Sequence, residues 1–214
     1  MDSICVKNVL PEVFVSRTDI ESEVWRREVT FSRGNVYLVS ADSGTGKSSL
    51  CSFIYGVRRD YSGDILFDGE NIRNMSLSRW CDIRSRAISY LPQDLCLFPE
   101  LTAAENIFMK LRLTRYKTEA EVKRYFEILG IADKYDSLVG RMSIGQQQRV
   151  AIIRTLCQPC DFFLMDEPVS HLDARNNDIA ARLIADEVKR SGAGLIFTSV
   201  GNNLNIEQQE VLKL

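Results

Sequence analysis

The chain has 214 residues, of which 45% are hydrophobic and 26% are charged, enough to bury a sizeable core as one domain. Its formal net charge of -2 gives no electrostatic reason to expect nucleic acid or an anionic membrane surface as a partner. No apolar run reaches the roughly 18 to 20 residues that span a bilayer, and the N-terminus MDSICVKNVL lacks the features of a signal peptide. We therefore expect a cytoplasmic protein.

Short β-branched runs alternate with helical patterns along the chain. Residues 34–41 predict a buried strand, and the spacing of Leu50, Phe53 and Ile54 predicts a helix after a tight turn. Further predicted elements are a hairpin at 63–72, strands at 87–93, 162–165 and 194–199, and helices at 118–131, about 144–157 and 177–192. This alternation predicts a largely parallel sheet flanked by helices. Residues 94–145 lack a clear core strand, and we interpret them as a helical insertion.

The stretch ADSGTGKSS, residues 41–49, matches the phosphate-loop pattern G-x-x-x-x-G-K-[ST] except at its first position. Small residues let backbone N–H groups approach phosphate oxygens, and the following helix adds its positive N-terminal end. The lysine is expected at the β- and γ-phosphates, and the serine after it is expected to ligate Mg²⁺. A glycine-rich turn that binds nothing is the alternative, and the flanking strand and helix argue against it. The predicted nucleotide-binding residues are Ala41, Asp42, Ser43, Gly44, Thr45, Gly46, Lys47, Ser48 and Ser49.

Two adjacent carboxylates, Asp166 and Glu167, follow the apolar run at 162–165. A carboxylate at the end of such a strand is expected to hold Mg²⁺ through water, opposite Ser48. Glu167 is then placed to orient or deprotonate an attacking water. Alone, the pair reads equally well as a solvated turn, but the phosphate loop elsewhere in the chain favours a site.

The six cysteines are scattered, and only Cys157 and Cys160 have a spacing associated with redox or metal chemistry. With one histidine in the chain, a zinc site would lack ligands. A thioredoxin-like role is the alternative; we favour reduced cysteines at the end of a helix and assign them no function.

Beyond these two motifs, the chain resembles the nucleotide-binding subunit of ATP-binding cassette (ABC) transporters over nearly its whole length. Gln93 in YLPQD is similar to the Q-loop of that family, and residues 97–107 are similar to the segment after it. Residues 141–156, RMSIGQQQRVAIIRTL, resemble the signature motif, and SHLD at 170–173 resembles the D-loop. The ordered set is specific, because a generic phosphate-loop kinase or GTPase is not expected to carry the signature.

This resemblance implies an α/β fold: a P-loop NTPase (RecA-like) core with a mostly parallel sheet, a small antiparallel β subdomain and a helical signature subdomain at about 94–145. It implies ATP and Mg²⁺ as cofactors, with Gln93 beside Ser48 and Asp166 at the metal and beside Glu167 in catalysis. It also implies two partners, a second ABC subunit in a head-to-tail dimer and an integral membrane permease. The permease would hold the chain at the inner face of the cell membrane.

In the family, the signature motif acts on ATP held by the opposite subunit. The resemblance therefore places Ser143, Gly145 and Gln146 at the partner's nucleotide, and Asp173 of the D-loop at the dimer interface. Ile144 stands where the family usually has glycine, and Met142 where it usually has leucine. A β-branched side chain near the phosphate is expected to weaken closure. Outside this context, the stretch reads as a polar helix start.

Adenine in such sites commonly stacks on an aromatic residue near the N-terminus, and Phe14 is the candidate; a core phenylalanine is the equal alternative. The family also has a histidine after the last core strand, and the aligned residue is Ser199. Serine forms hydrogen bonds but lacks the reach and protonation of imidazole, so slow hydrolysis is expected. His171 is then either an exposed loop residue or a group that compensates for Ser199 in trans.

Three functions remain open: an ATPase subunit that drives a membrane transporter, a hydrolysis-impaired cassette acting as the regulatory half of a heterodimer, and a non-transport ABC ATPase. The third is disfavoured, because such proteins usually carry a coiled-coil insertion or tandem cassettes. The residues at 77–94 resemble lipoprotein-release, macrolide-exporter and cell-division cassettes, and the final QEVLKL resembles the last strand of the family.

Overall fold

The computed structural model describes every residue except 18, 41, 43, 202–203 and 207–209. Its central layer is a parallel sheet in the order β6-β7-β8-β3-β9. These strands are β3 (Val36–Ser40), β6 (Ile88–Leu91), β7 (Phe162–Asp166), β8 (Gly194–Ser199) and β9 (Glu210–Lys213). The alternation of strands and helices in the sequence predicted this sheet, and the prediction is confirmed.

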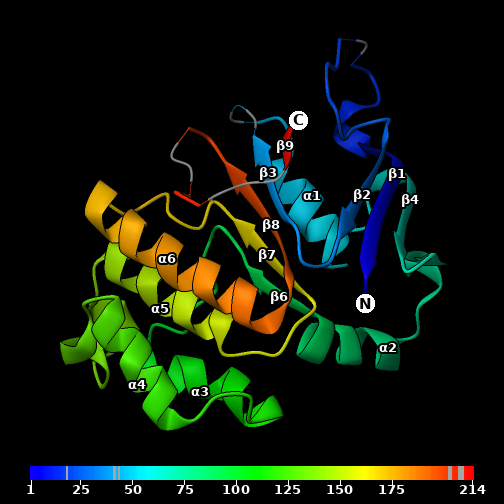
Figure 1. The fold of residues 1–214 in the computed structure, drawn as a ribbon. Coiled ribbons are helices and arrows are strands. Elements are labelled where there is room, and N and C mark those ends of the chain that lie inside the picture. Colours follow the sequence, from blue (N-terminus) through cyan, green and yellow to red (C-terminus); the bar gives the residue numbers. More distant parts are fainter. Residues whose placement is uncertain (18, 41, 43, 202–203, 207–209) are drawn as a thin grey trace.

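A second, antiparallel sheet lies beside the first in the order β2-β1-β4-β5 (Figure 1). Its strands are β1 (Ser3–Pro11), β2 (Glu28–Ser32), β4 (Tyr61–Phe67) and β5 (Glu70–Asn71). The predicted hairpin at 63–72 corresponds to β4 and β5, whereas β1 and β2 were not predicted from the strand pattern. The predicted strand at 87–93 is shorter, since β6 ends immediately before Pro92.

Helices cover both faces of the parallel sheet (Figure 1). The described helices are α1 (Lys47–Ile54), α2 (Leu77–Asp82), α3 (Ala103–Thr114), α4 (Glu119–Ile128), α5 (Ile144–Leu156) and α6 (Ala174–Ser191). Helix α1 lies between the two sheets, and α5 and α6 lie on the opposite face with α3 and α4 outside them. Within the described ranges, no helix combines the length and apolar character that crossing a membrane requires.

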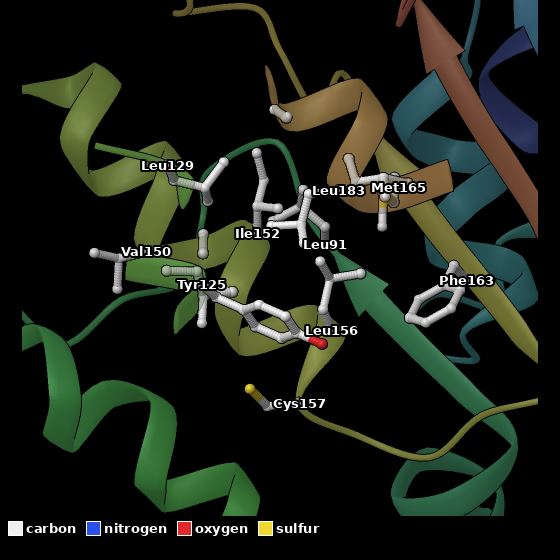
Figure 2. Packing of buried hydrophobic residues seen from close by; sticks show 14 of the residues in the cluster. Leu91, Tyr125, Leu129, Val150, Ile152, Leu156, Cys157, Phe163, Met165 and Leu183 are labelled. Carbon is white, nitrogen blue, oxygen red and sulfur yellow. The ribbon is translucent and has the colours of Figure 1, made fainter. Parts of the chain in front are cut away.

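Alternation along the parallel strands divides the interior into two cores. In β7, Phe163 and Met165 pack with α5 and α6, whereas Phe162 and Leu164 pack with α1 and the antiparallel sheet. Figure 2 shows the first of these cores, in which Tyr125 and Leu129 of the α4 region meet residues of α5 and β7. Both faces of β7 are therefore buried from solvent, as expected of a central parallel strand.

Reciprocal caps fix the starts of three helices outside the sheet. Thr102, Thr118 and Ser143 each accept a hydrogen bond from the backbone N–H three residues on, and the side chain at that third position bonds back. Helix α6 begins at Ala174, earlier than predicted, because Asp173 caps it. The helical character of residues 103–128 agrees with the predicted insertion, while its boundaries at about 94–145 stay a prediction.

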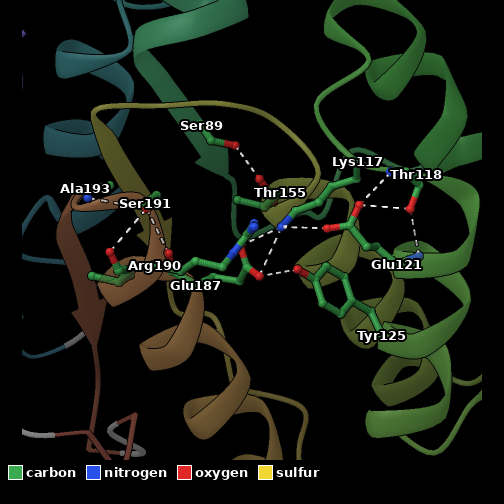
Figure 3. Close-up of polar contacts among 11 residues, drawn as sticks. Ser89, Lys117, Thr118, Glu121, Tyr125, Thr155, Glu187, Arg190, Ser191 and Ala193 are labelled. Carbon is green, nitrogen blue, oxygen red and sulfur yellow. Dashed lines mark hydrogen bonds and ion pairs between the residues drawn. The ribbon is translucent and has the colours of Figure 1, made fainter.

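A buried polar cluster joins the α4 region to α6 (Figure 3). Nζ of Lys117 donates to both carboxylate oxygens of Glu187, at 3.1 and 2.9 Å. The Tyr125 hydroxyl also donates to this carboxylate, and Arg190 pairs with it at 2.8 Å. The side chains of Lys117 and Glu187 are only 1% and 7% exposed, so each provides an opposite charge that stabilises the other in the interior.

Lys117→Met should lower the free energy of unfolding by about 3 kcal/mol, because it leaves the buried Glu187 carboxylate without its buried cationic partner. Urea unfolding followed by circular dichroism would measure the change. The double variant Lys117→Met/Glu187→Leu should recover part of the loss, since it removes both charges. A double variant less stable than the single one would contradict this account of the pair.

Candidate functional site

The phosphate loop lies between the end of β3 and the start of α1, as the sequence predicted. Gly46 has φ +99°, and a Cβ there would lie 3.1 Å from side-chain carbons of both Phe14 and Trp25, so only glycine fits. The Thr45 hydroxyl donates to the Asp42 carbonyl at 2.8 Å, and the Trp25 indole donates to the Thr45 carbonyl at 3.0 Å. These bonds shape the loop. Ala41 and Ser43, also predicted to bind nucleotide, lie outside the described residues.

Lys47 is the first residue of α1 and is 5% exposed. Its Nζ donates to the Asp42 carbonyl at 2.7 Å and lies 4.0 Å from Oε1 of Glu167. The lysine thus faces both the loop and the carboxylates, as a phosphate-binding cation should. Ser49, in contrast, accepts a hydrogen bond from the Arg58 guanidinium at 2.9 Å, so its side chain helps to hold Arg58 beside the loop.

A line of hydrogen bonds connects three of the predicted residues. The Ser48 hydroxyl donates to Oε1 of Gln93 at 3.1 Å, and Nε2 of Gln93 donates to Oε2 of Glu167 at 3.4 Å. Ser48 belongs to α1, Gln93 follows β6 and Glu167 follows β7. The carboxyl ends of parallel strands therefore bring together residues that are far apart in sequence, where ligands bind in α/β sheets.

Asp166, at the end of β7, is 1% exposed and has one carboxylate oxygen in use. Its Oδ1 accepts a hydrogen bond from the Thr198 hydroxyl at 2.6 Å, while the buried Oδ2 has no hydrogen-bond partner among the described residues. A buried carboxylate oxygen without a partner is unfavourable unless a cation or water completes it. Together with the oxygens of Ser48 and Gln93, this hard donor set suits Mg²⁺.

Glu167 has φ +50°, a conformation uncommon for a residue with a side chain. Its backbone is held on both sides: its N–H donates to the Thr198 hydroxyl at 3.1 Å, and its carbonyl accepts from Nε2 of Gln148 at 3.1 Å. Such strain persists only where surrounding bonds fix it, typically at functional sites. It directs the Glu167 side chain to Gln93 and Lys47.

Thr198 and Gln148 were not predicted from the sequence, although both hold the carboxylates. Thr198 lies on β8, whose register places it opposite Asp166. Gln148 lies on α5 and is 1% exposed. A signal for Gln148 existed: its amide lies on the mostly apolar face that α5 turns to the core. Thr198 has the residue type of any β-branched strand position, so no sequence pattern marks it as a site residue.

The signature residues lie at the exposed N-terminus of α5. The Gln146 N–H donates to the Ser143 hydroxyl at 3.3 Å, and the Ser143 N–H donates to the Gln146 amide oxygen at 2.9 Å. A Cβ on Gly145 would lie 2.9 Å from the His171 carbonyl, so glycine lets the D-loop approach the helix. Ile144 is 50% exposed. Among the described residues, no hydrogen bond joins this motif to the phosphate loop of its own chain.

Asp173 caps α6 through both carboxylate oxygens, which accept from the backbone and the side chain of Asn176 at 2.8 Å. The backbone N–H of Asn176 is the main cause that lowers the pKa of Asp173. Within one chain, the role of Asp173 is therefore to cap α6. Its predicted place at a dimer interface stays a prediction.

Phe14 lies against the phosphate loop but is only 8% exposed. The Arg17 guanidinium lies over its ring, 4.7 Å from the centroid. Phe14 and Arg17 both line a cavity of about 310 Å³ next to Asp42 and Thr45. The stacking of adenine on Phe14 stays a prediction. Stacking on the ring face that Arg17 covers would require the Arg17 side chain to move.

Ser199 is the last residue of β8 and is 2% exposed. Its hydroxyl is buried without a hydrogen-bond partner in the described part of the chain. The side chain is therefore enclosed beside the sheet, and its predicted catalytic contact is left without support from any hydrogen bond to the other site residues.

Ser48, Gln93, Asp166 and His171 all line one cavity of about 750 Å³. Its remaining lining residues are Ser52, Tyr55, Val57, Tyr90, Pro92, Asp94, Cys96, Lys110 and Arg154. Burial and the nearby Arg154 lower the pKa of Lys110 to about 8. No salt bridge within the described ranges neutralises Lys110 or Arg154. The cavity thus brings two basic side chains into the same lining as the metal-binding residues.

All six cysteines are free. Cys157 and Cys160 are buried, and burial raises the pKa of both thiols well above the usual value. A thiol that resists deprotonation is a poor nucleophile, which agrees with the structural interpretation of this pair.

A family model described as ABC transporter matches residues 26–170. The lipoprotein-releasing system ATP-binding protein LolD of Shewanella denitrificans is 30% identical over 203 residues, covering 92% of this chain and 86% of that protein. LolD 1 of Chlorobium chlorochromatii is 29% identical over 175 residues, covering 80% of this chain and 71% of that protein.

Two solved structures share the fold. The dimeric structure of MJ0796, a bacterial ABC transporter cassette, gives a TM-score of 0.79 at 25% identity, covering 98% of this chain and 94% of the other. A bacterial Atm1-family ABC exporter with ATP bound gives 0.78 at 24% identity, covering 100% of this chain and 37% of the other. With the family model covering more than half of its length, this chain belongs to the ABC transporter family.

Proposed function

We propose that this chain is the ATP-binding subunit of an ABC transporter, which binds and hydrolyses ATP at a head-to-tail dimer interface to drive a membrane permease. The observation that carries this proposal is the line of hydrogen bonds from Ser48 through Gln93 to Glu167, beside the open oxygen of Asp166. It joins a phosphate-binding turn, a cation site and a carboxylate base at one edge of the sheet.

Each residue has a role that follows from its position. The N-terminus of α1 and Lys47 bind the β- and γ-phosphates. Ser48, Gln93 and Asp166 would hold Mg²⁺, which would supply positive charge to neutralise the charge that develops on the phosphates. Glu167 accepts the proton of the attacking water, and its fixed backbone keeps the carboxylate aimed at that water.

The signature motif supports the dimeric arrangement. Ser143, Gly145 and Gln146 start a 13-residue helix whose N-terminus is exposed and separate from the phosphate loop of the same chain. Helix N-termini attract anions. A second copy or a related ABC subunit is the source of that anion, and MJ0796 is described as dimeric.

A permease is the second proposed partner. It would place the chain at the cytoplasmic face of the cell membrane, and the cavity of about 750 Å³ offers a docking surface that reaches Gln93. The LolD relatives are named for lipoprotein release, so we propose a transporter of that type. Co-purification of the tagged chain with a permease, and higher ATP turnover in that complex than in the chain alone, would test this role. A chain that purifies without any membrane subunit would favour a non-transport ABC ATPase.

A hydrolysis-impaired regulatory cassette is the second candidate. The observation that favours it is the enclosed Ser199, which offers no imidazole where the family has its histidine. A homodimer with turnover no higher than its Glu167→Gln variant, measured with the permease present, would support this candidate over the first.

Ile144→Gly should lower the ATP concentration that half-maximally drives dimerisation by about 10-fold, equivalent to about 1.4 kcal/mol. Ile144 is half-exposed at the N-terminus of α5, the end that would contact the nucleotide of the other subunit in the dimer. Its branched side chain would hold this end of the helix away from that nucleotide. Light scattering during an ATP titration, in a Glu167→Gln background that preserves ATP, measures the midpoint. Ile144→Ala should lie between the two, and three equal midpoints would contradict the steric explanation.

A further inference from the structure

His171 is the only histidine of the chain, and contacts within its own chain favour one tautomer of its ring. Its backbone N–H donates to Oε1 of Gln148 at 2.8 Å, and its Nδ1 lies 3.2 Å from the same oxygen. Nδ1 also lies 3.1 Å from the Ser170 hydroxyl. An amide oxygen only accepts hydrogen bonds, so the contact with Gln148 favours the tautomer in which Nδ1 carries the hydrogen. In neutral imidazole the lone pair then belongs to Nε2.

The same amide that holds His171 also holds Glu167. Gln148 accepts from His171 through Oε1 and donates to the Glu167 carbonyl through Nε2 at 3.1 Å. Because Gln148 is 1% exposed, its amide is fixed in the interior, and it sets the two residues relative to each other. His171 is thereby tied to the carboxylate base of its own chain.

His171 also lines the cavity that contains Ser48, Gln93 and Asp166 of the same chain. Its Nε2 has no hydrogen-bond partner in the part of the chain that the structure describes. His171 thus brings an imidazole to the lining of the cavity that contains the metal-binding residues, whereas the enclosed Ser199 offers only a buried hydroxyl.

We propose that His171 is a catalytic residue in cis: its Nε2 accepts a hydrogen bond from the water that Glu167 deprotonates. In this step, one proton of the water passes to Glu167, and the water oxygen bonds to the γ-phosphorus. The bond from that phosphorus to the bridging oxygen breaks, and ADP leaves. His171 holds the other hydrogen of the water and gains no proton. This inference rests on the proposed ATPase function and replaces the expectation that His171 acts in trans.

Two variants separate the action of Nε2 from a structural role. His171→Ala removes the whole ring. His171→Asn keeps a short amide N–H that reaches Gln148 but has no atom in place of Nε2. Both should lower kcat by about 10-fold or more, with little change in KM, because orientation of the water is lost while nucleotide contacts remain. A wild-type kcat in His171→Asn would overturn the proposal and assign His171 a structural role.

The wild-type rate relative to Glu167→Gln separates failure of this inference from failure of the proposed function. A wild-type rate above that of Glu167→Gln, unchanged by His171→Ala, overturns only the role of His171. A wild-type rate equal to that of Glu167→Gln overturns both. Equal melting temperatures of the variants would show that the rates are compared between folded proteins.

Differently tagged subunits distinguish action in cis from action in trans. A mixed dimer of wild type with the double variant Glu167→Gln/His171→Ala keeps one complete site if His171 acts in cis, and about half of the rate. A mixed dimer of His171→Ala with Glu167→Gln then has no complete site and should fall to about half of the rate of the His171→Ala homodimer. The reverse order, or equal rates in the two mixed dimers, would overturn the proposal.

Discussion

Glu167→Gln should lower the kcat of ATP hydrolysis by about 100- to 10,000-fold while leaving ATP binding nearly unchanged. Glutamine has the shape of glutamate but no basic oxygen, so it cannot accept the proton of the attacking water. The unusual backbone of this residue should survive, because its N–H and carbonyl are held by Thr198 and Gln148 and not by its own side chain. Phosphate release under steady-state conditions measures the rate, and equilibrium binding of labelled ATP measures the affinity.

Lys47→Ala provides the contrast, since it should weaken ATP binding itself by removing the cation of the phosphate loop. Unchanged turnover in Glu167→Gln would show that this carboxylate is not the base. The hydrolysis-impaired alternative would then be the better description of the chain.

Thr198→Val should raise the Mg²⁺ concentration that gives half-maximal activity by about 10- to 100-fold. A loss of metal affinity of this size is expected when a group that orients a metal ligand is removed. Valine has nearly the shape of threonine, so packing within β8 should be preserved. The hydroxyl that donates to Asp166 at 2.6 Å and accepts from the Glu167 N–H at 3.1 Å disappears, leaving both unsatisfied.

Thr198→Ser is the matched control for this variant, because it keeps the hydroxyl and loses only a methyl group. Mg²⁺ titrations of ATP turnover would compare the two. If the serine variant is as impaired as the valine variant, packing and not the hydroxyl determines the effect.

Local motifs made most of the site predictable from the sequence. Lys47, Ser48, Asp166 and Glu167 sit within short patterns that specify both their residue type and the strand or helix beside them, and the structure brings these four close to Gln93. The parallel sheet was predicted from the alternation of strand and helix patterns along the chain. Prediction succeeded where the physical cause lies within a few residues of the motif.

The remaining site contacts depend on the packing of distant segments. Thr198 meets Asp166 only because β8 pairs with β7 in one register. The guanidinium that covers Phe14 belongs to a loop residue that no motif identifies. The resemblance to the family implied the small antiparallel subdomain, but the strand pattern alone predicted only its hairpin, because β1 and β2 pair across a long loop that local patterns do not reveal.

The close approach at Gly145 has a consequence for how the two nucleotides of a dimer would communicate. The residue leaves no room for a side chain between α5 and the His171 carbonyl, and the next turn of that helix carries Gln148, which holds Glu167. Movement of the helix toward the nucleotide of one subunit would therefore displace the base that activates water for attack on the nucleotide of the other. Occupancy of either site would be sensed at its neighbour, and we expect ATP turnover to be cooperative.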